Sequence, residues 1–273
     1  MDTPMINNRL SLIALLISLV GCSAPQEPSD MIFIEGASFK MGTDAADLEK
    51  SAIAAGLETT RALMEEVPGH MVTLDDFYLD KYDVTNDQFA QFIQANQAWA
   101  KGNVDPKDKY LEYWLDAAPP EALMQHPVTF ITWPSAVAYC NWMDKRLPTE
   151  IEYEWAAGDG KTRSEFPWGD AFPTNDLVNW SGNDIETTTA VGSYPPNERG
   201  LYDMAGNIWH FTADPWLGSY EQMLNAAEVE NPDNRYVIRG GSFGASAANL
   251  RVRYRDSHRA LDAREMVGFR CAK

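Results

Sequence analysis

The chain has 273 residues, of which 40 are acidic and 22 basic, and its net charge is −18 at pH 7. That charge argues against general binding to nucleic acid or to anionic lipid head groups. Because 45% of the residues are hydrophobic and 11% are aromatic, the composition is that of a folded protein. The acidic excess predicts either a surface that resists self-association or one that attracts a cationic or calcium-bearing partner.

The amino terminus predicts an exported lipoprotein. The apolar run LSLIALLISLVG spans about a dozen residues, too few to cross a bilayer but typical of a signal-peptide core. It ends in LVGC, which resembles the lipobox of bacterial lipoproteins, and a plain signal peptide is the alternative. We therefore expect residues 1–21 to be removed, Cys22 to carry lipid and residues 22–30 to form a tether. Ser23, where Asp is the usual retention signal, implies an outer-membrane location facing the periplasm.

The first part of the domain predicts strands and helices in alternation. MIFIEGASFKMG (31–42) predicts two short strands, and the Ala- and Glu-rich segment 44–66 predicts a helical excursion. The partly alternating segment 72–85 predicts a strand. Thr85 and Gln88 have the spacing of a capping box at the start of a helix.

The rest of the chain predicts fewer regular elements. Residues 99–125 form a polar insert without clear periodicity, and TWPSAVAYCNWMDK (132–145) predicts a helix with Pro134 at its first position. Thr149 and Glu152 repeat the capping-box pattern. Residues 158–273 are rich in Gly, Pro, Asn and Asp, with only short strand-like runs. Since no linker interrupts residues 31–273, we expect one loop-rich α+β domain.

Several residues that could form a disulfide, bind a metal or act in catalysis allow more than one interpretation. With Cys22 assigned to lipid, Cys140 and Cys271 form one disulfide or remain two buried thiols. No nucleotide-binding, zinc-protease or nucleophile-elbow motif occurs, and the four histidines lack metal-ligand spacing. NWSGNDI (179–185) and LYDMAGNIWH (201–210) offer the oxygen ligands that calcium prefers, unless their Asn and Asp side chains only cap turns.

A series of motifs then resembles one family over nearly all of residues 31–273. The motifs are FKMG, YDVTNDQFAQF, KRLPTEIEYEWAA, FPWGD, GLYDMAGNIW, VIRGGSF and VGFRCA, in this order. They resemble the formylglycine-generating enzymes, also called sulfatase-modifying factors. The resemblance implies a variant of the C-type lectin fold with little regular secondary structure.

The same resemblance implies that the best-known activity of the family is lost. Its oxidases bind copper through two cysteines shortly after the GGS motif, and Ala245 and Leu250 lie near those positions here. Neither side chain can bind copper or form a thiolate, so we expect no copper and no formylglycine generation by that route. Ser242 matches the active-pocket serine of the family and is therefore a pocket candidate.

Further positions are carried over from the family by their motifs. Cys140 and Cys271 match its disulfide. Its first calcium site maps to Asn179, Trp180, Asn183 and Ile185, with Asp184 as the alternative to Asn183. Its second maps to Asp203, Gly206, Ile208 and His210, where histidine replaces glutamate and should weaken or empty the site. We expect any calcium to be structural.

The arginines after the glycine pair are the last candidates. Arg251, Arg253 and Arg255 alternate, so a strand would turn all three to one face. In an acidic domain they should pair with Asp and Glu, and recognition of a ligand carboxylate by Arg251 and Arg253 in a pocket is the alternative.

These expectations combine into two hypotheses of function. The first is a lipid-anchored envelope protein that binds an exported protein or peptide without copper-thiol chemistry. The second is an enzyme that modifies an exported protein, peptide or siderophore-like metabolite by other active-site chemistry. The membrane contact is the lipid anchor in both, and nucleic acid is a partner in neither.

Overall fold

The computed structural model describes residues 30–104, 109–115, 118–158, 164–225, 231 and 233–273. The expected signal peptide, Cys22 and nearly all of the tether therefore lie outside the described residues. No helix in the described part of the chain is long and apolar enough to cross a membrane.

Within the described residues, eight short strands form three sheets, two of them antiparallel and one mixed. β1 (Met31–Ile34) pairs with β4 (Phe77–Asp80), and β2 (Ser38–Met41) pairs with β3 (His70–Thr73), both antiparallel. The central sheet has the order β7-β6-β5-β8 and is antiparallel except for the β5–β8 pair. Its strands are β5 (Trp209–Pro215), β6 (Arg235–Arg239), β7 (Arg255–Arg259) and β8 (Val267–Gly268).

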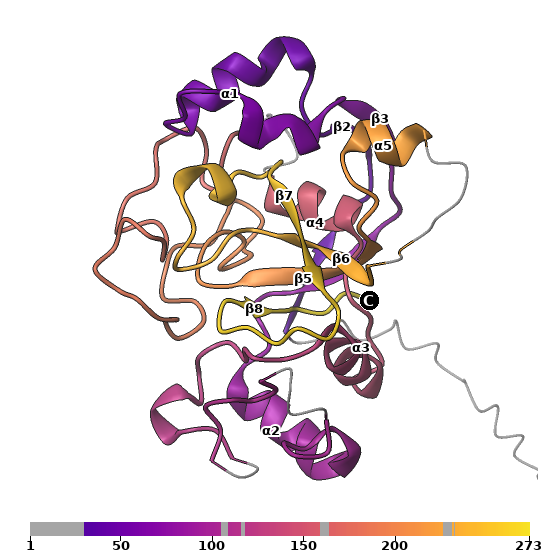
Figure 1. Cartoon of the computed structure of the whole chain (residues 1–273), viewed down its shortest axis with the longest axis vertical. Helices are drawn as coiled ribbons and strands as arrows, with labels where there is room; N and C mark the ends of the chain where they lie inside the picture. The colour runs from indigo at the N-terminus through magenta and orange to yellow at the C-terminus, as the bar shows by residue number, and fades with distance from the viewer. Residues whose placement is uncertain (1–29, 105–108, 116–117, 159–163, 226–230, 232) are drawn as a thin grey trace, which may run out of the picture.

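The described part of the chain also contains five α-helices. They are α1 (Leu48–Ala54), α2 (Asn86–Ala95), α3 (Trp133–Trp142), α4 (Glu150–Ala157) and α5 (Tyr220–Asn225). In Figure 1, α1 and α5 lie at one end of the molecule with β2 and β3, whereas α2 and α3 lie at the other. α4 crosses beside the central sheet between these two ends.

Local chemistry explains where the helices begin. Both expected capping boxes are present, with Thr85 accepting the amide of Gln88 and Thr149 accepting the amide of Glu152. Thr132 starts α3 in the same way, so Pro134 occupies the second helical position and not the first. The segment 44–66 is helical but broken, because the chain turns at Gly56 with a φ of 69° between α1 and the 3₁₀ helix Arg61–Glu66.

The prediction of a single strand over residues 72–85 is wrong. The chain leaves β3 at Thr73 and begins β4 at Phe77, changing its partner from β2 to β1. Asp76 fixes the crossing, because its Oδ1 accepts the backbone N–H of Gly36 at 2.7 Å. A side chain that bonds to a neighbouring turn interrupts the strand ladder in this way.

The main apolar cluster lies where α2 and α3 meet the carboxy-terminal residues. Phe89 stacks on Tyr139 with ring centroids 5.7 Å apart, and Phe269 meets both rings edge-on. Beside them Cys140 and Cys271 form a disulfide, which confirms the expected pairing. The covalent link fastens α3 to the end of the chain, 131 residues later.

Candidate functional site

The glycine pair that follows β6 makes a close backbone approach to α4. Gly240 and Gly241 have φ values of 93° and 74°, which favour glycine. A Cβ at Gly240 would lie 2.5 Å from the hydroxyl of Tyr153, so no larger residue fits there without movement. The next two residues, Ser242 and Phe243, are thereby held inside the fold.

Ala245 and Leu250, the residues expected near the two cysteine positions of the oxidases, are part of the core. Ala245 is 6% exposed and Leu250 is fully buried, and both belong to an apolar cluster that contains Phe166. Trp168 and Trp180 pack against the same cluster. The side chains of Ala245 and Leu250 are hydrocarbon, which neither binds copper nor carries electrons.

Ser242 is buried and does not line the cavity beside it. The residue is 1% exposed, and its Oγ has no hydrogen-bond partner among the described residues. It is Phe243 that faces a cavity of about 210 Å³. The other residues lining this Phe243 cavity are Asn86, Tyr113, Leu123, Thr129, Phe130, Thr187, Thr188 and Glu265.

Hydrogen bonds within the protein hold one wall of the Phe243 cavity. Asn86 caps the space with its amide nitrogen bonded to the carbonyls of Leu123 and His126 at 2.9 and 3.2 Å. Its amide oxygen accepts the hydroxyl of Tyr113 at 2.6 Å. Sequence reasoning missed this cavity because Tyr113 comes from the 99–125 insert, whose lack of periodicity gave no sign of a packed wall.

Arg251, Arg253 and Arg255 do not lie on one strand. Residues 251–254 form a turn in which the N–H of Tyr254 bonds to the carbonyl of Arg251 at 3.1 Å, and β7 begins only at Arg255. The expected strand over residues 251–255 is therefore wrong. All three side chains are nevertheless buried, with 1%, 5% and 2% of their surface exposed.

The structure gives these arginines acidic partners. Arg251 binds Glu165 at 2.9 Å through Nε, and Arg253 binds the other oxygen of the same carboxylate at 2.7 Å. Arg255 binds both oxygens of Glu150 at 2.8 Å. Burial disfavours the ionised carboxyl of Glu150, but Arg255 and Arg239 hold its pKa below the ordinary value. These ion pairs leave Arg251 and Arg253 inside the fold, away from the Phe243 cavity.

The acidic residues that bind these arginines were not predicted from the sequence. Glu150 and Glu154 lie one turn apart on α4 and both bind Arg239. Their i, i+4 spacing places them on one helix face, which was the available signal. Glu66, which also binds Arg251, and Glu165 come from segments far from the arginines in sequence, so no local sequence pattern predicts these partners.

The first calcium-type loop fits a hard cation. The amide nitrogen of Asn179 bonds to the carbonyl of Thr187 at 2.9 Å, and that of Asn183 bonds to the carbonyl of Val178 at 3.0 Å. These bonds leave Asn179 Oδ1 and Asn183 Oδ1 buried without a hydrogen-bond partner among the described residues. Asp184 and Ile185 are exposed at the same loop. Two free amide oxygens beside backbone carbonyls are ligands that calcium accepts.

The second calcium-type segment does not fit. His210 is fully buried, with Nε2 2.6 Å from Asp83 and Nδ1 2.9 Å from the hydroxyl of Tyr153. Both ring nitrogens are thus engaged within the protein, and Asp203 already accepts the N–H of Gly192 at 2.7 Å. Arg270 supplies a cation to the same Asp83. The Arg270 side chain therefore already provides a positive charge beside Asp83 and His210, whereas no observation supports a cation at Gly206 and Ile208.

Comparison with known proteins shows which family the chain belongs to. Residues 18–273 match the family described as sulfatase-modifying factor enzyme 1-like domain. The chain is 32% identical over 255 residues to the serine/threonine-protein kinase pkn1 of Chlamydia pneumoniae, covering 90% of this chain but 38% of that protein. The chain therefore spans well under half the length of that relative.

Other relatives match over most of both chains. The formylglycine-generating enzyme of Thermomonospora curvata is 30% identical over 307 residues, with 91% of this chain and 95% of that protein covered. A Bos taurus protein named inactive C-alpha-formylglycine-generating enzyme 2 is 27% identical over 289 residues, with 89% and 87% covered.

A solved structure has the same fold. PvdO from Pseudomonas aeruginosa superposes with a TM-score of 0.67 at 24% identity, over 89% of this chain and 93% of that one. The α+β arrangement is therefore the fold of the formylglycine-generating enzymes, as the motifs predicted. The chain belongs to the sulfatase-modifying factor family, and Ala245 and Leu250 are packed in an apolar cluster of its core.

Proposed function

We propose that this protein is a lipid-anchored, periplasm-facing member of the family that binds a segment of an exported protein or peptide in the Phe243 cavity. It does so without copper-thiol oxidation. The observation that carries the proposal is the burial of Ala245 and Leu250 where the oxidases need thiolates. A relative named inactive among the matches supports the loss of that chemistry within the family.

The Phe243 cavity is the site where we propose that the exported segment binds. Its volume of about 210 Å³ suits one or two side chains of a peptide. Aromatic faces of Tyr113, Phe130 and Phe243 offer apolar contact, and the threonine hydroxyls offer hydrogen bonds. Pre-formed walls around Asn86 lower the ordering cost of binding.

A site-specific crosslink tests the binding proposal. A photoreactive phenylalanine analogue placed at Thr187, an exposed residue lining the cavity, should crosslink in living cells to one exported polypeptide. The matched control carries the analogue at Thr59, which is exposed, follows α1 in the chain and does not line the cavity. Phe243→Ala, which removes a wall, should abolish the crosslink from Thr187. No crosslink from Thr187, or equal crosslinks from both positions, would contradict the proposal.

The anchor is tested separately. We propose that Cys22 is acylated after removal of residues 1–21 and that residues 22–30 connect it to the domain. Supporting this is the sequence LVGC after the apolar run. Metabolic labelling with a tritiated fatty acid should mark the wild-type chain and leave Cys22→Ser unlabelled. Labelling of the serine variant would rule the anchor out.

We also propose one structural calcium ion at the first loop, held by Asn179 and Asn183 with carbonyls of the same loop, and none at the second. The support is the pair of buried, unpartnered amide oxygens at the first and the engaged His210 at the second.

A further inference from the structure

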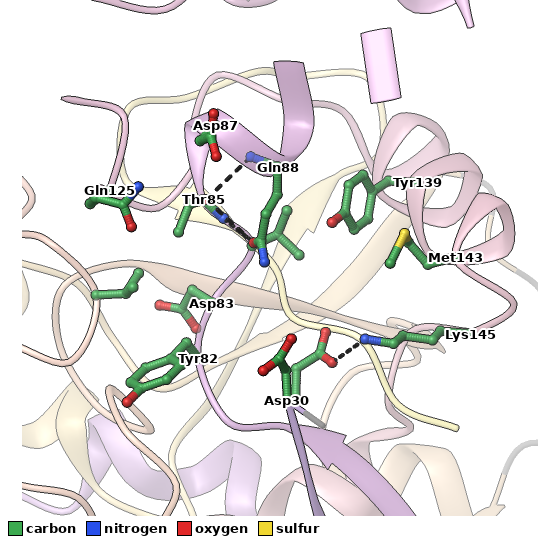
Figure 2. A pocket seen from close by; sticks show the side chains of 13 residues that line it. Asp30, Tyr82, Asp83, Thr85, Asp87, Gln88, Gln125, Tyr139, Met143 and Lys145 are labelled. Atoms are coloured by element: carbon green, nitrogen blue, oxygen red, sulfur yellow. Dashed lines mark hydrogen bonds and ion pairs between the residues drawn. The ribbon is translucent and has the colours of Figure 1, made fainter. Parts of the chain in front are cut away.

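The structure describes the chain from Asp30 onward, and Asp30 lies beside the ends of β4 and α3. Its backbone carbonyl accepts the N–H of Lys81, the residue after β4, at 3.0 Å. Asp30 also borders a cavity of about 420 Å³ together with Met143 and Lys145, which follow α3 (Figure 2). The expected tether therefore joins the domain next to these two elements.

A row of side chains crosses the surface at this junction. Phe33 on β1 is opposite Tyr78 on β4, with ring centroids 5.4 Å apart. Tyr78 and Lys273 exchange both backbone hydrogen bonds at 2.9 Å, so these two residues are also directly opposite each other. Lys273 binds Asp144, the neighbour of Met143, at 2.7 Å. We call the surface formed by Phe33, Tyr78, Lys273 and Met143 the exit face.

The exit face exposes large apolar side chains. Phe33 is 48% exposed, because successive residues of a strand alternate and its neighbour Ile34 is buried in the core. Met143 is 42% exposed, as is Trp142 at the end of α3. Aromatic and other long apolar side chains beside a lysine are typical of the interface between a protein and a phospholipid bilayer.

Two carboxylates beside the exit face have lysine partners. Lys273 pairs with Asp144 at 2.7 Å, and Lys145 pairs with Asp80 at 2.6 Å. The net charge of −18 disfavours contact with anionic head groups in general. Contact between this face and a membrane therefore depends on the apolar side chains, and zwitterionic phospholipid suits it best.

The proposed lipid anchor brings this face close to a membrane. Even when fully extended, the chain from Cys22 to Asp30 reaches at most about 29 Å. A domain of this size has a diameter of roughly 45 Å. An anchored chain therefore cannot turn the side opposite to Asp30 against the bilayer.

We propose that the exit face lies on the phospholipid surface of the membrane that holds the anchor, with Phe33 and Met143 inserted among the head groups. The inference rests on the lipid anchor proposed above and does not depend on binding in the Phe243 cavity. Phospholipid is the partner that the tether keeps within reach of this face at all times.

The collision accessibility of a nitroxide label tests the proposal on the full-length, acylated chain in phosphatidylcholine vesicles. Flotation of the vesicles first measures whether the chain is anchored. Because Cys140 and Cys271 form a disulfide and Cys22 carries lipid in the proposal, a single introduced cysteine takes the label. Labels at Phe33→Cys and Met143→Cys should lose most of their collisions with a water-soluble nickel chelate and gain collisions with oxygen.

The matched control is a label at Ile53→Cys. Ile53 is 76% exposed on α1, which lies at the opposite end of the molecule from α3 (Figure 1), so its label should stay accessible to nickel. With the label at Met143, Phe33→Glu should restore nickel collisions, because a carboxylate resists transfer out of water, and Ile53→Glu should not.

The outcomes separate this inference from the anchor itself. A chain that floats with the vesicles while its labels at positions 33 and 143 stay as accessible as the label at position 53 would overturn the exit face and leave the anchor intact. Shielding that disappears when the protein is diluted within the vesicles identifies a second copy of the chain as the partner, and it would also overturn the proposal. A chain that does not float refutes the anchor, and this inference falls with it.

Discussion

Arg251 and Glu66 are 185 residues apart in the chain and form a buried two-point ion pair, with Arg251 Nη2 3.0 Å from Glu66 Oε2. Both residues are 1% exposed. The pair fastens the end of the helical segment 44–66 to the turn that follows the glycine pair. The arginines of that turn therefore link distant segments of the domain, and Arg251 directly follows the buried Leu250.

Breaking this pair should strongly destabilise the protein. Arg251→Met leaves Glu66 buried without its cation, and we expect a loss of about 3–5 kcal/mol in the free energy of unfolding. Urea denaturation measures this loss. The double variant Arg251→Met, Glu66→Gln should lose less than the two single variants together, because no charge is then left unpaired.

A surface pair is the matched control for that variant. Arg264 and Asp262 are 2.9 Å apart but 55% and 34% exposed, so Arg264→Met should cost less than about 1 kcal/mol. Equal losses for the buried and the exposed arginine would show that the buried network does not hold the segment.

Asp214 should make the protein less stable as the pH rises from 4 to 6. Burial, together with nearby Glu150 and Glu152, raises the pKa of Asp214 to about 6 although it accepts the N–H of Glu150. Between the unfolded value near 3.8 and about 6 the unfolded chain releases a proton that the folded chain keeps, so ionisation favours unfolding. The free energy of unfolding should fall by about 2–3 kcal/mol over this range, and this contribution should not change further above pH 6.

Asp214→Asn isolates that contribution. The amide oxygen still accepts the N–H of Glu150, so the variant should be more stable than wild type at pH 7 and closer to it at pH 4. Thermal unfolding over this pH range provides the measurement. A stability difference that does not change with pH would contradict the assigned pKa.

Calcium should stabilise the chain through one site only. At a free concentration a hundredfold above its dissociation constant, one ion adds about 2.7 kcal/mol to stability. The double variant Asn179→Ala, Asn183→Ala should lose the calcium-dependent rise in Tm, and Asn175→Ala, an exposed neighbour, should keep it. Calorimetry should count one ion per chain. Two ions, or a rise that survives the double variant, would contradict the assignment.

The disulfide should contribute about 2–5 kcal/mol, because it closes a loop of more than a hundred residues in the unfolded chain. Replacing Cys140 and Cys271 together by serine should lower the urea midpoint accordingly. The same fall should follow treatment of the wild type with a reductant under unfolding conditions. An unchanged midpoint in both cases would mean that the bond is absent from the folded protein.

The sequence predicted the features that depend on short-range chemistry. The boxes at Thr85 and Thr149 need only a hydroxyl and a partner three residues later, and the structure has both. The motif order was enough to predict the fold and the disulfide. The prediction of a single strand over residues 72–85 was wrong because Asp76 bonds to Gly36, 40 residues away.

The turn at residues 251–254 is a second place where long-range contacts override the local sequence pattern. Alternation of Arg251 and Arg253 predicted a strand, but both bind one carboxylate, that of Glu165, from a segment 86 residues away. Buried ion pairs of that kind override local pattern because an unpaired charge in the interior costs several kcal/mol. The Phe243 cavity likewise depends on which segments meet, because its lining residues come from positions 86 to 265 of the chain.

Conversion of a sulfatase-derived cysteine peptide, followed by mass spectrometry in the presence of copper, tests the central claim most directly. The Thermomonospora curvata enzyme, run in parallel, serves as the positive control. With Ala245 and Leu250 packed in the core, this protein should bind no stoichiometric copper and leave the peptide cysteine unchanged. Formation of formylglycine together with one copper ion per chain would contradict the account.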